Sequence, residues 1–169
     1  MSAAQKDMQS WVLLGATATG KTSVALELAD RHPVEIVSVD SMKIYRGMDI
    51  GTAKPPEDQR RGVPHHMMDV ADPEEECDVG WFYRRAHDVI DDIKDRGNRP
   101  LLVGGSALYL KALIWGLFEG PGSSEEVREK LRAEAEEKGR HALHDRLKEV
   151  DPASADKIHP NDLKRIVRA

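Results

Sequence analysis

The stretch "GATATGKT" at residues 15–22 decides the fold expected for this chain. It matches the pattern G-x-x-x-x-G-K-[S/T], in which a lysine and a hydroxyl residue follow directly after the second glycine. The apolar run "SWVLLG" at residues 10–15 precedes it, and "KTSVALELADRH" at residues 21–32 carries apolar residues at helical spacing after it. A strand, a glycine-rich loop and a helix in this order predict a phosphate-binding loop.

The loop offers a phosphate three kinds of contact. Its glycines allow the backbone to wrap closely, so that successive N–H groups point at phosphate oxygens, and the dipole of the following helix favours anions. Lys21 can neutralise charge between two phosphates, and the Thr22 hydroxyl can complete a Mg²⁺ shell made mostly of water and phosphate oxygens. The alternative is a chance glycine-rich turn. The predicted phosphate-binding set is Gly15, Ala16, Thr17, Ala18, Thr19, Gly20, Lys21 and Thr22.

Further strands and helices alternate along the first part of the chain. The segments "VEIVSVD" at residues 34–40 and "RPLLVGG" at residues 99–105 are typical of buried strands. Asp78 can cap a helix that ends near Gly97, and another helix is expected from about Ser106. This alternation predicts an α/β fold, namely a parallel sheet like that of the P-loop NTPases with helices on both faces.

Two stretches depart from that alternation. Residues 41–77 show little periodicity and contain many glycines and prolines, which predicts a long functional loop or several short elements. After "EGPGSSEE" the pattern becomes all-helical, and Ser123 with Glu126 fits a capping box at the start of the first helix. We therefore expect an α/β core at residues 1–120 and a helical insertion at residues 121–169.

Asp40 stands at the carboxyl end of the second predicted strand, the edge at which open α/β sheets bind ligands. Two interpretations remain open. The carboxylate caps the next turn, or it lies beside the phosphate loop, where it binds Mg²⁺ through water or takes a proton from an incoming nucleophile. The loop alone does not name a reaction, since nucleotide hydrolases, kinases and enzymes that expel pyrophosphate all stabilise the same kind of charge.

Composition excludes several classes of protein. The net charge of -5, from 25 basic and 30 acidic residues, argues against general coating of nucleic acid. The single cysteine, Cys77, rules out an internal disulfide. No apolar run reaches membrane-spanning length and the start lacks a secretory signal, so we expect a cytoplasmic protein. The basic end "KIHPNDLKRIVRA" is either a solvated helix face or a local binding surface.

Five blocks of the sequence together carry a family resemblance. They are "GATATGKT", "EIVSVDSMKIYRGMDIGTAKP", "VPHHMMDVADP", "RPLLVGGSALYLKALIWGL" and "DPASADKIHPNDLKRIVRA". In this order, and in register from Trp11 to Ala169, they resemble the tRNA dimethylallyltransferases. The resemblance implies transfer of a dimethylallyl group from dimethylallyl diphosphate to N6 of adenosine 37, in tRNAs that read codons starting with U, with release of diphosphate.

The resemblance also implies residue roles. Thr17 and Lys21 would act at the reacting centre with Asp40, which would take the proton of the exocyclic amine after the adenine has flipped out of its stack. Mg²⁺ would be the cofactor, held by Thr22. The chain would act as a monomer. The positions implied to meet tRNA are Asp40, Ser41, Met42, Lys43, Ser106 (where the family usually has threonine), Arg128, Lys164, Arg165 and Arg168.

Besides Ser106, the chain departs from the family pattern in length, because family members are longer and this chain ends inside the helical insertion. Three alternatives remain: an adenylate isopentenyltransferase acting on free nucleotides, a small-molecule kinase with a phosphate loop, and a non-catalytic binding module. The adjacent His65 and His66 are interpreted as packing or exposed residues rather than metal ligands.

Overall fold

The computed structural model describes residues 9–117 and 124–169. Contacts divide the chain into two compact units, Met1–Phe118 and Glu119–Ala169. The domain boundary expected after residue 120 falls outside the described residues, so it stays a prediction. None of the helices in the described ranges has the length and apolar character needed to cross a membrane.

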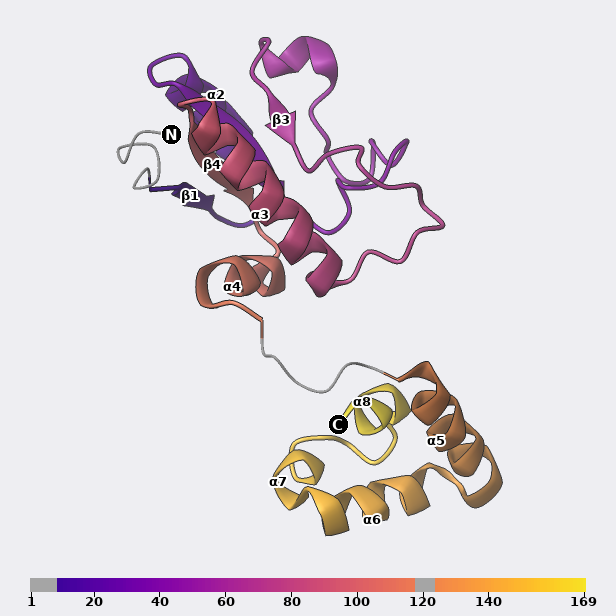
Figure 1. Cartoon of the computed structure of the whole chain (residues 1–169). Helices are drawn as coiled ribbons and strands as arrows, with labels where there is room; N and C mark the ends of the chain where they lie inside the picture. The colour runs from indigo at the N-terminus through magenta and orange to yellow at the C-terminus, as the bar shows by residue number, and fades with distance from the viewer. Residues whose placement is uncertain (1–8, 118–123) are drawn as a thin grey trace. The chain divides into compact units, whose positions relative to one another are not determined.

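The first unit is built on a four-stranded sheet in which every strand runs parallel to its neighbour. The central strand β2 is buried along its whole length, as expected of a parallel sheet that is covered on both faces. Register places Ile36 beside both Leu101 and His65. The spatial order is β1-β4-β2-β3 (Figure 1), for strands β1 (Trp11–Leu14), β2 (Val34–Val39), β3 (His65–His66) and β4 (Arg99–Gly104).

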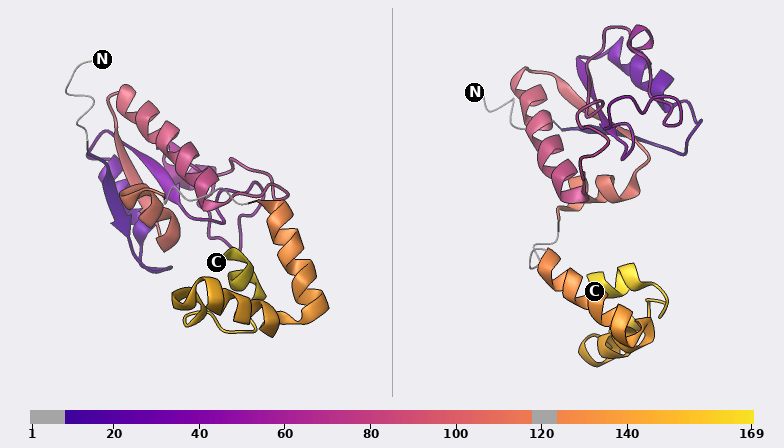
Figure 2. Two further views of the ribbon diagram at one scale, coloured as in Figure 1. Left: turned by 60° about the horizontal axis from the view of Figure 1, so that its bottom comes forward. Right: turned by 90° about the vertical axis from the view of Figure 1, so that its right-hand side faces the viewer.

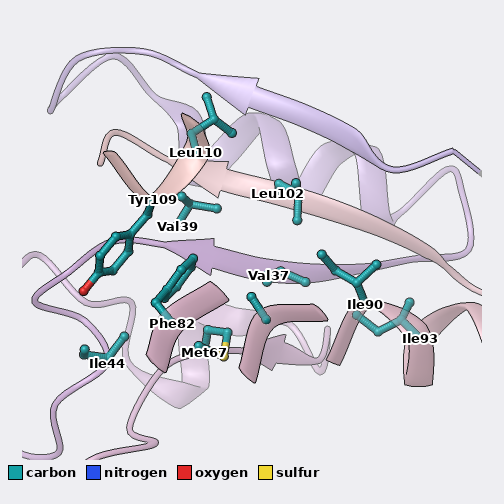
Figure 3. Close-up of a cluster of buried hydrophobic side chains, with 11 residues drawn as sticks. Val37, Val39, Ile44, Met67, Phe82, Ile90, Ile93, Leu102, Tyr109 and Leu110 are labelled. Atoms are coloured by element: carbon teal, nitrogen blue, oxygen red, sulfur yellow. The ribbon is translucent and has the colours of Figure 1, made fainter. Parts of the chain in front are cut away.

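Helices cover both faces of this sheet, as expected from the sequence. Alternate side chains of β2 point to opposite faces. Ile36 packs with Ala25 and Leu26 of α2 on one face, whereas Val37 and Val39 pack with α3 and α4 on the other (Figure 3). The predicted α/β fold is therefore confirmed. The three helices are α2 (Lys21–Ala29), α3 (Val79–Asp95) and α4 (Ala107–Trp115), and α3 lies along the sheet in Figures 1 and 2.

Helix α3 shows how the sequence fixes an element. Its first turn is capped by Asp78, whose carboxylate accepts a hydrogen bond of 2.7 Å from the Trp81 amide. Gly97 follows the helix in a left-handed conformation with φ of 80°, which favours glycine. Tyr109 of α4 stacks on Phe82 with ring centroids 4.0 Å apart. The buried face of α3 consists of Phe82, Ala86, Ile90 and Ile93.

The aperiodic segment 41–77 is ordered by one buried lysine. The Lys54 ammonium donates hydrogen bonds of 2.7 Å to the Tyr45 carbonyl, to Asp49 Oδ1 and to Asp69 Oδ1, and only 3% of its side chain is exposed. These contacts tie Tyr45 and Asp49 to Asp69, and the 3-10 helix η1 (Glu57–Arg60) and strand β3 lie between Lys54 and Asp69 in the chain. The segment is thus several short elements, the second of the two expectations.

The second unit is a small helical cluster. A buried apolar core of Ala135, Leu143, Leu147, Ala155 and Ile166 holds it together. Ser124 caps the first helix, because its hydroxyl accepts a hydrogen bond from the Val127 amide, whereas the capping box expected from Ser123 lies on a residue outside the described ranges. The helices are α5 (Glu125–Lys138), α6 (Arg140–Val150), α7 (Pro152–Ala155) and α8 (Leu163–Arg168).

Candidate functional site

The glycine-rich loop between β1 and α2 lines a cavity of about 650 Å³, and every residue from Gly15 to Thr22 contributes to the wall. Lys21 folds back over the loop, since its ammonium donates hydrogen bonds of 2.8 Å to the Gly15 carbonyl and 2.6 Å to the Ala16 carbonyl. Gly20 takes φ of 82° directly before the helix. The loop therefore has the backbone form and the cation that bind phosphate oxygens.

Asp40 lies in the wall of the same cavity, directly after β2. Its Oδ1 accepts hydrogen bonds from the Met42 amide at 2.9 Å and the Lys43 amide at 3.3 Å. Within the described part of the chain, Oδ2 has no hydrogen-bond partner. Asp40 thus caps the following turn through one oxygen, and the second oxygen is left to meet a ligand.

Lys43 contributes its side chain to the cavity from the turn that Asp40 caps. Burial lowers the pKa of its ammonium, the nearby Asp40 carboxylate raises it, and the like charge of Lys21 lowers it further. Among the described residues, no ion pair or hydrogen bond engages the ammonium. The cavity therefore holds two lysines from different elements together with one carboxylate.

Ser41 and Ser106 are brought together where β2 and β4 end. The Ser106 hydroxyl accepts a hydrogen bond of 3.1 Å from the Ser41 amide, and the Ser106 amide donates to the Val39 carbonyl at 3.3 Å. Gly104 allows this close approach, because a Cβ there would lie 2.1 Å from the Val39 carbonyl oxygen. Ser106 lines the cavity, and Met42, which follows Ser41 in the chain, is 43% exposed.

His65, interpreted from the sequence as a packing or exposed residue, is part of the cavity wall. Its Nδ1 lies 2.8 Å from the Val63 carbonyl, which can only accept, so Nδ1 carries the hydrogen and Nε2 keeps a lone pair. Burial lowers the pKa of the ring, which favours its neutral form. A two-residue strand gives no periodic signal, and the pairing of β3 with β2 alone brings His65 to the site.

The remaining predicted tRNA contacts lie in the helical unit. On α8, Lys164, Arg165 and Arg168 are exposed while Ile166 is buried, so the basic side chains share the outer part of the helix. Arg165 pairs with Asp162 through a contact of 2.5 Å. Arg128 on α5 forms an exposed ion pair of 3.4 Å with Glu125. Both helices therefore present cations to solvent.

The oxygen donors of the cavity suit Mg²⁺ better than a transition metal. Thr22 supplies a hydroxyl and Asp40 a carboxylate, and Mg²⁺ binds through few protein oxygens together with waters and phosphates. Within residues 9–117 and 124–169, no group of three or more His, Cys, Asp or Glu side chains could hold a metal on its own. The residues fit an ion that is bound jointly with a phosphorylated ligand.

The fold and the cavity define a P-loop-like α/β protein in which the glycine-rich loop and the Asp40 carboxylate line one cavity. Comparison with known proteins then narrows the class. The family model described as IPP transferase matches residues 43–169, and the chain belongs to this family.

Two bacterial relatives illustrate the match. The chain is 50% identical over 159 residues to a tRNA dimethylallyltransferase of Koribacter versatilis, which covers 94% of this chain and 52% of the relative. It is 48% identical over 158 residues to a tRNA dimethylallyltransferase of Geobacter sulfurreducens, covering 94% and 51%. The chain thus spans about half the length of the curated relatives it matches.

Solved structures of two such transferases have a fold similar to that of this chain. The full-length tRNA isopentenylpyrophosphate transferase of Bacillus halodurans superposes with a TM-score of 0.65 at 42% identity, over 96% of this chain and 54% of the other. A eukaryotic dimethylallyltransferase acting on tRNA gives a TM-score of 0.77 at 32% identity, over 94% of this chain and 40% of the other.

Proposed function

We propose that this chain serves the transfer of a dimethylallyl group from dimethylallyl diphosphate to N6 of adenosine 37, in tRNAs that read codons starting with U. Diphosphate is the leaving group. The observation that carries the proposal is the shared cavity, which both the phosphate loop and Asp40 line. A carboxylate with a free oxygen beside a phosphate cradle is the arrangement that such a displacement needs.

The loop stabilises the departing diphosphate. As the bond between carbon and oxygen breaks, negative charge grows on the diphosphate oxygens, and the loop N–H groups and the Lys21 ammonium stabilise that charge. Two of the three N–H donors of the Lys21 ammonium contact the Gly15 and Ala16 carbonyls in this structure, which leaves the third for a diphosphate oxygen. Thr17 lies within the loop at the reacting centre. Mg²⁺, held by the Thr22 hydroxyl, would supply further neutralisation of charge.

Asp40 acts on the nucleophile. Two backbone amides hold its Oδ1, so the carboxylate has a fixed orientation and Oδ2 accepts the proton of the exocyclic amine. The adenine enters the cavity unstacked, because an amine in a stacked base cannot reach this oxygen. Asp40 is therefore both the base and a contact to the substrate nucleotide.

The tRNA is held by residues of both units. Ser41, Met42, Lys43 and Ser106 are proposed to meet the nucleotide near the cavity, and Arg128, Lys164, Arg165 and Arg168 to meet the anticodon stem. Contacts of the basic side chains to phosphate would give affinity rather than base choice. We propose that the protein works in the cytoplasm as a monomer.

A transfer assay tests the proposal. Labelled dimethylallyl diphosphate and Mg²⁺ are mixed with an anticodon stem-loop that carries A36-A37-A38, and label on the RNA is expected with wild type. Asp40→Asn should lose the label, and Asp91→Asn, on the exposed side of α3, is the matched control that should keep it. Movement of the γ-phosphate of ATP to a metabolite would support a kinase, and label on free adenylate would support the nucleotide enzyme.

A further inference from the structure

We infer that Lys43 binds the diphosphate together with Lys21, each lysine coming from a different element, and that the tRNA is not the ligand of Lys43. The inference rests on the proposed function only in taking the anion to be a diphosphate. It replaces the contact to tRNA that is proposed above for Lys43 by a contact to the leaving diphosphate.

The placement of the two lysines supports this assignment. Lys21 begins α2, directly after the phosphate loop, whereas Lys43 lies in the turn that follows β2. Both side chains line the same cavity of about 650 Å³ with the whole loop from Gly15 to Thr22. An anion in the loop therefore lies in a space that a cation enters from two separate elements.

The surroundings of the Lys43 ammonium differ from those of Lys54, a buried lysine in the same aperiodic segment, residues 41–77. Lys54 donates to three acceptors, including Asp49 and Asp69, and these contacts raise its pKa although burial alone would lower it. In the described part of the chain the Lys43 ammonium has no such partner. The nearby Asp40 carboxylate offsets part of the cost of burying this cation, and a bound anion would supply further negative charge.

Exposure separates Lys43 from the basic residues proposed for the anticodon stem. Lys164 and Arg168 are exposed on α8, where a large polyanion can reach them, whereas Lys43 is half-buried in the cavity wall. A phosphate group of a bound diphosphate can approach the Lys43 ammonium within the cavity. The Lys43 side chain thus suits a small anion.

Lys43 also links the base to the leaving group. Its backbone amide donates to Asp40 Oδ1 at 3.3 Å, while the residue lines the cavity and its ammonium interacts with the charge of Lys21. Replacing the side chain keeps the backbone contact that orients Asp40. Lys43→Met therefore removes the ammonium alone, and Lys43→Arg keeps the positive charge.

The experiment measures binding of Mg²⁺-pyrophosphate to the chain by calorimetry. Lys43→Met should weaken binding about tenfold to a hundredfold, the effect of losing a charge-assisted hydrogen bond, and Lys43→Arg should stay within a few-fold of wild type. Lys111→Met on the exposed side of α4 removes the same charge outside the cavity and should have no effect. Circular dichroism confirms folding, and Lys43→Gln is the second neutral variant if Lys43→Met does not fold.

A parallel titration with the anticodon stem-loop separates the two assignments. Unchanged RNA affinity of Lys43→Met, together with weakened pyrophosphate binding, supports the inference. Weakened RNA binding with unchanged pyrophosphate binding overturns it, as does an equal loss in Lys111→Met or no pyrophosphate binding by wild type.

The transfer assay distinguishes this inference from the proposed function. Label transfer by wild type, with pyrophosphate affinity that does not depend on Lys43, leaves the proposed function standing and removes the role of Lys43. Pyrophosphate binding that depends on Lys43, without label transfer by wild type, keeps the role of Lys43 and removes the proposed function.

Discussion

The two ends of strand β2 carry two acids in very different surroundings. Near the amino end, Glu35 is buried and its carboxylate accepts two hydrogen bonds from Arg96, one from Asn98 at 2.8 Å and one contact of 2.6 Å from His66. Just past the carboxyl end, and among the residues the structure describes, Asp40 accepts hydrogen bonds through Oδ1 alone, from two amides of the next turn.

The difference separates an acid that holds the fold from one that is free for chemistry. Burial alone would raise the pKa of Glu35, but the hydrogen bonds from Arg96, Asn98 and His66 outweigh it and lower the pKa to about 2. Alternation along the strand turns Glu35 toward the α3 side and Asp40 toward the cavity. A carboxylate whose two oxygens both accept hydrogen bonds from the protein links elements of the fold. A carboxylate with one oxygen left without a partner can bind a ligand.

The largest expected effect is on the transfer rate and comes from substituting Asp40, just past the carboxyl end of β2. Asp40→Asn keeps the shape and the turn cap but removes the base, so the single-turnover rate of dimethylallyl transfer to the stem-loop should fall about 10² to 10⁴-fold. The free energy of unfolding should change little. A rate close to that of Asp91→Asn would show that Asp40 is only a turn cap.

Substitution of Glu35, near the amino end of β2, should instead lower the stability of the fold and leave ligand binding unchanged. Glu35→Ala leaves Arg96, Asn98 and His66 without their shared acceptor, and the free energy of unfolding should fall by about 3 kcal/mol in urea denaturation. Pyrophosphate affinity of the folded variant should be retained. The control is Glu27→Ala, which breaks only exposed ion pairs and should cost less than about 1 kcal/mol. Equal costs in both variants would contradict the contrast.

A pH titration sharpens the same contrast. Because folding lowers the pKa of Glu35 from 4.5 to about 2, the unfolded chain binds the proton first, and the stability from this residue is complete above pH 4.5. It should be lost as the pH falls from 4.5 toward 2, by up to about 3 kcal/mol. Glu35→Gln should flatten this part of the curve, and an unchanged acid limb would count against the Glu35 network.

The smallest effect is expected on the basic helix α8. Lys164→Ala should weaken stem-loop binding about three-fold and reduce the slope of its salt dependence by about one, while pyrophosphate affinity stays the same. Lys148→Ala is the control, since Lys148 is already paired with Asp145 on α6 of the same unit. Equal loss of RNA and pyrophosphate binding would indicate that Lys164 supports the fold.

Much of this architecture follows from local sequence patterns. The phosphate loop, the strand that ends at Asp40 and the helix from Asp78 to Gly97 each depend on residues close together in the chain. Short-range periodicity and capping report on such elements directly. The position of Asp40 beside the loop then follows from the rule for carboxyl ends of parallel strands.

The rest depends on contacts between distant residues. Glu35 and Arg96 lie 61 positions apart, and Lys54 reaches Asp69 across 15 positions of aperiodic chain. His65 reaches the cavity because β3 pairs with β2, and Lys43 because the turn after β2 lines the same cavity as the phosphate loop. No periodic signal in one sequence specifies these pairings, so the Glu35 network, the buried Lys54 and the place of His65 in the cavity wall could not be predicted. Lys43 is expected at the site only from the family resemblance, as a tRNA contact.

The central claim is that the phosphate loop and the turn after β2 serve one bound anion. A titration of the ¹⁵N-labelled chain with Mg²⁺-pyrophosphate, followed by amide chemical shifts, tests it most directly. We expect the amides of residues 15–22 and those of Met42 and Lys43 to shift together with one dissociation constant, while the amides of Glu35 and Asn98 do not move. Shifts confined to the loop, with Met42 and Lys43 unchanged, would contradict it.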